Sequence, residues 1–223
     1  MYLPAHFKEE DVATLHALIR AHPLATLVTL GADGLDANHI PMEIDPGPGP
    51  LGTLRGHVAR ANPVWRSHRG DVHALAIFAG PDTYISPSWY RAKEESGRVV
   101  PTWNYVVVHA HGPLVAIEDR EWLRRFVTRL TDRHEGDRPD RWHVTDAPAD
   151  YIDRQLQAIV GIEIPLARLE GKWKMSQNRE AADRAGVVTG LRAAGDPTSR
   201  AVADHVEKTL DPPPTSPRGP RSG

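Results

Sequence analysis

Polar and aromatic residues gather in four segments of this sequence, in a way that a plain barrel core would not require. The segments are LRGHVARANP (54–63), YISPSWYRAK (84–93), VPTWNY (100–105) and GKWKMSQN (171–178). Cationic and hydrogen-bonding side chains of this kind can bind a phosphate dianion, and tryptophan rings can cover a flat ligand. We therefore take the four segments as the candidate site.

The first cations that could bind a phosphate lie in the strand-like run 52–60 and in the turn after it. Arg55 and His57 point the same way, because successive side chains of a strand alternate between its faces. Arg60 ends the strand. Asn62, which precedes a proline, is a good N-cap, and the N-terminus of the helix that it begins favours anions. Further cations that could meet the phosphate are Lys93, Lys172 and Lys174.

Ring surfaces come from Trp89, Trp103 and Trp173, and Gly56 would let a ligand approach the backbone. Any one of these residues has an alternative interpretation as a surface charge or a half-buried core aromatic, since most Arg and Lys side chains are simply solvated. The clustering of both residue kinds is what favours a binding site.

Two histidines form a separate constellation. His109 and His111 lie two apart on a probable strand and face the same way, as two metal ligands could. No third ligand is evident near them in the sequence, so we interpret them as a structural pair and predict no metal site. The chain has 12 histidines, among them His39 and His57, which leaves room for haem, but nothing indicates an axial ligand.

Nucleophilic catalysis is not indicated. Ser86 and Ser88 flank Pro87, but no G-x-S-x-G elbow surrounds them, and the chain has no cysteine. We assign no catalytic nucleophile.

Composition restricts the class of protein. The net charge of −2 gives no global field for holding nucleic acid or an anionic membrane. The lack of cysteine fits a chain with no need of an oxidising compartment. No run approaches the roughly 20 apolar residues of a membrane span, and the start MYLPAHFKEED lacks the regions of a signal peptide. We expect a cytoplasmic protein without a membrane partner.

Direct DNA binding is also not expected. A helix after Asp119 carries four arginines, but three acidic residues share it, which is typical of a solvated face. The arginines are Arg124, Arg125, Arg129 and Arg133, and the acids are Glu121, Asp132 and Glu135. No helix-turn-helix is apparent.

The elements that must position the site follow from apolar periodicity and turn signals. Asp33-Gly34 predicts a hairpin between its flanking strands, and Pro41 puts the second of them at an edge or a bulge. The predicted strands are 25–30, 35–45, 52–60, 72–80, 102–117 and 161–170. The predicted helices are 8–21, 63–69, one after Asp119, one through Ile152 that ends at Gly161, and one from Pro197.

Helices at both ends of a mostly antiparallel sheet, without regular βαβ alternation, indicate an α+β fold with a barrel. We expect one domain over residues 1–210. The Pro-, Ser- and Gly-rich tail 211–223 is expected to be disordered.

A series of uncommon motifs makes a family resemblance specific. In order along the chain they are MYLPAHF, ATLVTL, ANHIPM, LRGHVARANPVW, IFAGPDTYISPSWY, VPTWNY, VHAHG, LTDRHE, QLQAIVGIEI and GKWKMSQNR. This pattern closely resembles the PaiB-like family of FMN-binding negative transcriptional regulators, over roughly residues 1–210.

The resemblance implies an FMN-binding split β-barrel of the pyridoxamine-phosphate-oxidase and flavin-reductase type, flanked by helices. It also implies a homodimer, with FMN in the groove between the subunits. LRGHVARAN would hold the phosphate and the tryptophan-bearing segments would border the ring. The residues expected to bind FMN are Arg55, His57, Arg60, Asn62, Ser88, Trp89, Lys93, Trp103, Asn104, Lys174 and Gln177.

The function implied by the resemblance is control of gene expression, by a route that the sequence does not reveal, with DNA as a partner by resemblance only. Two alternatives stay open. One is an FMN-dependent oxidoreductase, in which the cofactor does the redox work. The other is a haem or flavin carrier without turnover.

Overall fold

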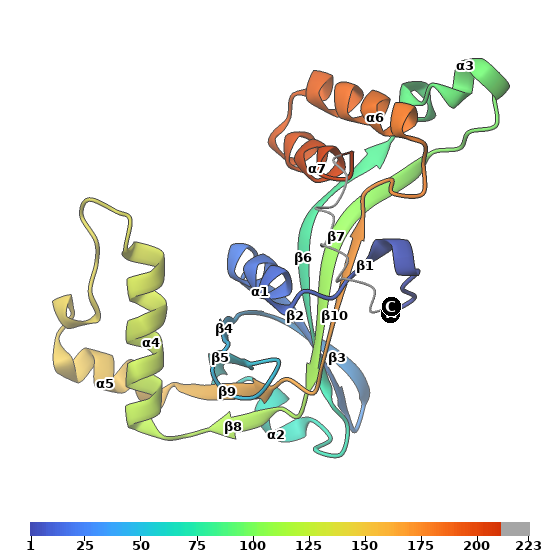
Figure 1. The fold of residues 1–223 in the computed structure, drawn as a ribbon. Helices are drawn as coiled ribbons and strands as arrows, with labels where there is room; N and C mark the ends of the chain where they lie inside the picture. Colours follow the sequence, from blue (N-terminus) through green and yellow to red (C-terminus); the bar gives the residue numbers. More distant parts are fainter. Residues whose placement is uncertain (211–223) are drawn as a thin grey trace, which may run out of the picture. The chain divides into compact units, whose positions relative to one another are not determined.

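The computed structural model describes residues 1–210, and the tail 211–223, expected to be disordered, lies outside the described residues (Figure 1). The strands are β1 (Lys8–Glu9), β2 (Leu24–Gly31), β3 (Gly34–Pro41), β4 (Glu43–Asp45), β5 (Thr53–Ala59), β6 (Ala74–Ile85), β7 (Thr102–Gly112), β8 (Val115–Ile117), β9 (Ile159–Pro165) and β10 (Arg168–Lys174). The helices are α1 (Val12–Ala21), α2 (Val64–Ser67), α3 (Ala92–Ser96), α4 (Arg120–Glu135), α5 (Ala149–Gln157), α6 (Ala181–Ala194) and α7 (Pro197–Glu207). Short 3-10 helices are η1 (Ala5–Phe7), η2 (Pro87–Trp89) and η3 (Val144–Asp146).

The strands form two sheets. One has the order β1-β10-β7-β6-β2-β3 and the other the order β4-β5-β9-β8. Figure 1 shows β6, β7 and β10 as long neighbouring strands. The pairs β2 with β3, β4 with β5, β5 with β9 and β8 with β9 are antiparallel. The predicted α+β class is confirmed.

The predicted hairpin at Asp33-Gly34 is present. β2 and β3 pair from Leu24 opposite Pro41 to Gly31 opposite Gly34. Gly34 has φ of 112°, in the left-handed region that glycine tolerates best. β3 is an edge strand and Pro41 is its last residue, as expected for a residue that cannot donate to a ladder.

Three predicted strands are wrong, because each divides where the chain passes from one sheet to the other. The run 35–45 forms β3 and β4, the run 102–117 forms β7 and β8, and the run 161–170 is divided between β9 and β10. The last two division points meet, since Ala167 N donates to His111 O at 2.9 Å. A Cβ at Gly112 would lie 2.1 Å from the carbonyl oxygen of Pro165. The close backbone approach therefore requires glycine there.

The helix predicted to end at Gly161 stops earlier. α5 ends at Gln157, and Gly161 lies inside β9. A Cβ at Gly161 would lie 2.3 Å from Cζ3 of Trp122 in α4. This glycine makes room for a tryptophan ring and does not cap a helix.

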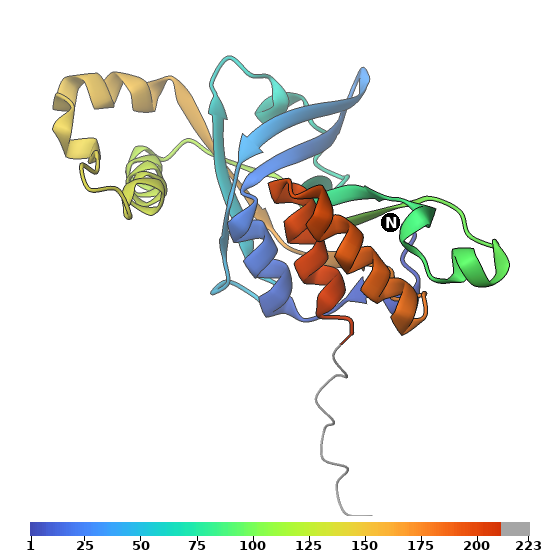
Figure 2. The same ribbon diagram turned by 90° about the horizontal axis from the view of Figure 1, so that it is seen from above.

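The chain divides into two compact units. Unit 1 comprises Met1, residues 9–79 and residues 107–171, and unit 2 comprises residues 2–8, 80–106 and the described chain from 172. In unit 1, Leu27, Leu54 and Ile162 are fully buried core residues. In unit 2, α6 packs against α7 (Figure 2). α6 was not predicted, and its buried Val187, Val188 and Leu191 form a short stripe. The single domain over 1–210 stays a prediction.

Within residues 1–210, none of the helices combines the length and the apolar character that crossing a membrane demands.

Candidate functional site

The predicted phosphate residues on β5 belong to unit 1. Arg55 lies opposite Glu43 of β4 and opposite Glu163 of β9. Its Nε donates to Glu163 Oε1 at 2.7 Å, and its Nη1 donates to Asp45 Oδ2. Burial opposes the charge, but the hydrogen bond that Arg55 donates to Glu163 and the charge of Asp45 outweigh it, so the pKa of Arg55 is raised. This guanidinium is bound within its own sheet.

Arg60 is likewise engaged. Its Nη1 donates to Glu118 Oε2 at 2.6 Å, and its Nε and Nη2 donate to the carbonyl oxygens of Gln157 (2.9 Å) and Ile159 (3.2 Å). These contacts join the end of β5 to the start of β9. A phosphate at Arg60 would have to use the N–H groups that remain.

Asn62 lies one residue before the N-cap of a very short helix, which is Pro63 and not Asn62 as predicted. Its Oδ1 accepts from Val64 N at 3.0 Å, and its Nδ2 donates to Asn38 Oδ1 at 2.7 Å. α2 has only 4 residues. Because a helix dipole sums over aligned peptide units, so short a helix attracts an anion weakly.

His57 faces α4. Its ring stands edge-on to Phe126, with centroids 5.9 Å apart, and its shielded Nδ1 has no hydrogen-bond partner among the described residues. Burial lowers the pKa of His57, so the imidazole is neutral at pH 7.

Two arginines that the sequence analysis assigned to a solvated face join Arg55 in an open cleft of about 380 Å³ in unit 1. They are Arg129 and Arg133 of α4, and Glu43 lies 3.0 Å and 4.0 Å from their guanidinium nitrogens. These α4 cations are therefore paired with a carboxylate from β4.

A second group of predicted residues meets in unit 2, where β7 begins and β10 ends. Lys174 Nζ donates to Thr102 Oγ1 at 2.5 Å and to Trp103 O at 2.6 Å. Its Nζ also lies 6.0 Å from the centroid of the Tyr105 ring. Burial, and then the charge of Lys172, lower the pKa of Lys174. This cation is held and partly desolvated.

The amides next to Lys174 are firmly positioned. Asn104 is fully buried, and its Nδ2 donates to Ser176 Oγ at 3.0 Å. Gln177 Nε2 donates to Trp173 O at 2.6 Å, and Gln177 Oε1 accepts from Met175 N at 2.7 Å. The turn that carries these contacts includes Ser176 with φ of 63°, a left-handed conformation uncommon for a residue other than glycine.

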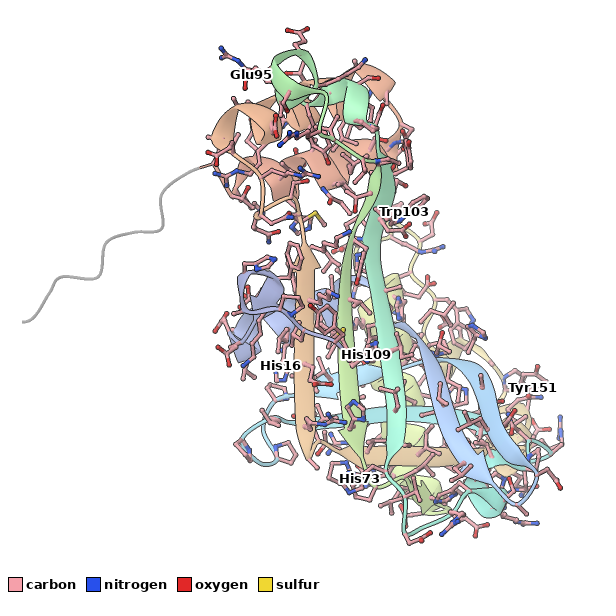
Figure 3. All side chains as sticks on the ribbon, turned by 90° about the vertical axis from the view of Figure 1, so that its right-hand side faces the viewer. His16, His73, Glu95, Trp103, His109 and Tyr151 are labelled. Atoms are coloured by element: carbon pink, nitrogen blue, oxygen red, sulfur yellow. The ribbon has the colours of Figure 1, made fainter. Side chains whose placement is uncertain are left out.

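Trp103 presents a flat surface in the same part of unit 2 (Figure 3). The residue is 49% exposed, although its Nε1 donates to Asp82 Oδ1 at 2.8 Å. The Tyr84 ring stands edge-on to it, with centroids 6.3 Å apart. The indole is thus oriented by Asp82 and Tyr84, while about half of the residue stays exposed.

Three further predicted residues lie near η2 and α3, also in unit 2. Lys93 Nζ donates to Ser88 Oγ at 3.4 Å. Trp89 lies against α6, where a Cβ on Gly190 would come within 2.4 Å of its Cδ2. Trp89 therefore has a packing role that its sequence position did not reveal.

The structure thus brings Trp103, Asn104, Lys174 and Gln177 into one cluster, which we call the β7/β10 cluster. The sequence analysis missed two of its members, Thr102 and Ser176. Both lie inside segments already marked as polar and aromatic, but only the pairing of β7 with β10 selects them.

Residues 1–168 match the model of the FMN_bind_2 family, described as "Putative FMN-binding domain". The chain belongs to this family. This FMN_bind_2 chain is 33% identical over 256 residues to an uncharacterised protein of Aspergillus fumigatus, covering 95% of this chain and 98% of that protein. It is 29% identical over 212 residues to the protease synthase and sporulation protein PAI 2 of Bacillus subtilis, covering 94% of this chain and 98% of the relative.

The fold is shared with solved structures. The FAD and haem binding protein of Mycobacterium smegmatis matches with a TM-score of 0.55 at 16% identity, over 75% of this chain and 73% of that one. The predicted flavin-binding split barrel and the resemblance to the PaiB-like family are confirmed, and FMN is the cofactor that the family description names.

Proposed function

We propose that this FMN_bind_2 chain is a dimeric FMN-binding regulator of gene expression whose flavin lies against the β7/β10 cluster. The observation that carries the site is the hydrogen bond from a partly desolvated cation, Lys174, to the main-chain carbonyl of Trp103, a residue that is half exposed. A positioned charge beside a flat apolar surface suits a ligand that is both anionic and aromatic.

Lys174 has a further N–H group beyond the two that bind Thr102 and Trp103, because an ammonium carries three donors. In the proposal this group meets an acceptor of FMN. Asn104 and Gln177 hold the turn in place, and Ser88, Trp89 and Lys93 supply the neighbouring surface. FMN, when bound, supplies an electron-accepting ring.

The residues of unit 1 that the sequence predicted to bind the phosphate remain a second, less favoured placement for it. Arg55, His57, Arg60 and Asn62 all have protein neighbours, so a phosphate would have to compete with or add to these contacts. Separate variants of Arg60 and Lys174 tell the two placements apart.

The dimer is proposed from the exposed apolar side chains around Trp103. Val100 is 64% exposed and Tyr84 is 47% exposed. A second copy that covers this region would remove the apolar surface from water and close the flavin site. Val100→Asp should yield a monomer with reduced FMN retention, whereas Leu35→Asp, at an exposed position on β3 in unit 1, should stay dimeric. A wild-type monomer that retains FMN tightly in sedimentation would contradict the shared site.

The regulatory role is supported by the relative PAI 2, which aligns over nearly its whole length. The α4 arginines do not favour direct reading of DNA. Arg124 pairs with Asp153, and Arg129 and Arg133 face Glu43. We therefore propose that control of expression runs through a partner or the flavin state, inside the cytoplasm.

Two experiments test the regulator against an oxidoreductase and against a direct reader of DNA. The purified holoprotein is mixed anaerobically with NADH or NADPH while its visible spectrum is followed, and a mobility-shift assay on the DNA upstream of its gene is run at physiological salt with and without FMN. An inert flavin and weak, unselective DNA binding are expected. Rapid bleaching would favour the oxidoreductase, and tight selective retention would identify a DNA-reading surface.

A further inference from the structure

The two histidines of β7 lie close to a carboxylate of the neighbouring strand β10. His109 and His111 lie on one face of β7, and the neighbouring strand β10 brings Glu170 to them. Figure 3 labels His109 on β7. One donor atom from each residue lies within 4.8 Å of the other two. The alternate residues of β7, Val108 and Ala110, are fully buried, so the two imidazoles lie on the opposite, partly exposed face of the strand.

We propose that His109, His111 and Glu170 bind a divalent transition-metal ion of the zinc class. Two imidazole nitrogens and one carboxylate oxygen are the ligand set of zinc sites that keep a fourth position open for water or a small anion. A tetrahedral ion holds its donors roughly 3.4 Å apart, given bonds of about 2.1 Å. Side-chain rotations that bring the donor atoms about an ångström closer together would therefore complete the coordination geometry.

The environment of the Glu170 carboxylate favours a bound metal ion. Glu170 Oε2 is shielded from solvent and accepts no hydrogen bond from the described residues. Its partners are long ion-pair contacts, with His111 Nε2 at 3.4 Å and with the N-terminal ammonium of Met1 at 3.6 Å. A metal ion would give this shielded carboxylate oxygen a short bond of about 2.0–2.2 Å instead.

The two imidazoles lie close together on β7, with ring centroids 6.4 Å apart. A metal ion binds the lone pair of a neutral ring nitrogen, so Zn²⁺ affinity should fall as the pH is lowered.

Arg168 is the competing group. Its Nη2 lies 3.1 Å from both ring nitrogens of His111, and its Nη1 lies 3.4 Å from Glu170 Oε1. Its side chain is more than half exposed, so it can turn into solvent when an ion enters. The alternative to a metal site is a closed network of Arg168, His111 and Glu170.

The test uses untagged holoprotein, incubated with Zn²⁺, desalted and assayed for metal, with Co²⁺ absorption as a report of coordination geometry. One ion per chain is expected. His109→Ala, His111→Ala and Glu170→Gln should each weaken binding at least tenfold, whereas His73→Ala, at an exposed position, should not. FMN content and thermal melting check that each variant is folded.

Arg168→Ala distinguishes the two readings. Removing a competing cation should leave Zn²⁺ affinity unchanged or raise it. The proposal is overturned if wild type retains no metal, if the three ligand variants bind like wild type, or if Arg168→Ala loses as much affinity as they do. None of these measurements depends on the proposed regulatory function.

Discussion

Lys174 Nζ donates a hydrogen bond of 2.6 Å to the carbonyl oxygen of Trp103. This contact ties the last residue of β10 to a β7 residue whose indole is half exposed. The hydrogen bond holds the Lys174 ammonium next to Trp103, and it requires both strands.

Lys174→Met should weaken FMN binding about ten- to a hundredfold, since a lost charge-assisted contact costs roughly 1.5–3 kcal/mol. Fluorescence titration of the apoprotein measures the affinity. Lys208→Met, which removes an exposed cation after α7, is the matched control and should leave affinity unchanged.

Arg60→Ala tests the placement of the phosphate in unit 1. If the phosphate lies at Arg60, Arg60→Ala weakens FMN binding about ten- to a hundredfold and Lys174→Met leaves it near wild type. If the phosphate lies at the β7/β10 cluster, Arg60→Ala leaves FMN affinity near wild type and removes only the contacts between the end of β5 and the start of β9.

Arg55→Met should lower the free energy of unfolding by about 1–3 kcal/mol, because Asp45 and Glu163 would face each other without their common partner. Urea denaturation followed by tryptophan fluorescence measures the loss. Arg69→Met, which removes a fully exposed pair with Asp71, is the control and should have no measurable effect.

Acidification should destabilise the fold partly through His57. Its folded pKa is lowered by burial, so the unfolded chain binds the proton more tightly. The stabilisation is complete above the unfolded value of about 6.5 and is lost as the pH falls from there through the folded pKa. His57→Gln should flatten the pH dependence of unfolding in that window. An unchanged slope would show that His57 already protonates freely in the fold.

Gly190→Ala should destabilise unit 2 by about 1–3 kcal/mol, since the new Cβ would meet the Trp89 ring at 2.4 Å. In a Trp89→Ala background the same change should become neutral or stabilising, because alanine favours a helix by about 1 kcal/mol over glycine. Gly70→Ala, where a Cβ meets nothing within 4 Å, is the control. Identical effects in both backgrounds would exclude the clash.

Local signals in the sequence were sufficient for many elements. Asp33-Gly34 predicted the β2/β3 hairpin, the helix predicted after Asp119 is α4, and the alternation predicted for Arg55 and His57 on β5 is confirmed. α6 escaped prediction because its apolar stripe is short and two of its glycines resemble helix breakers. Its stability comes from packing against Trp89 and α7, which no local pattern encodes.

By itself, the sequence determined the α+β class, the flavin-binding family and the segments that carry its polar and aromatic residues, because turns, periodicity and uncommon motifs are properties of neighbouring residues. Only the tertiary structure decided which of those residues meet. In the folded chain, Arg55 and Arg60 donate hydrogen bonds to carboxylates. Lys174 donates to the carbonyl oxygen of Trp103. Glu170 lies close to His109 and His111. Such contacts depend on which strands pair. That pairing is decided by burial and hydrogen bonding over the whole chain, not by residues a few positions apart.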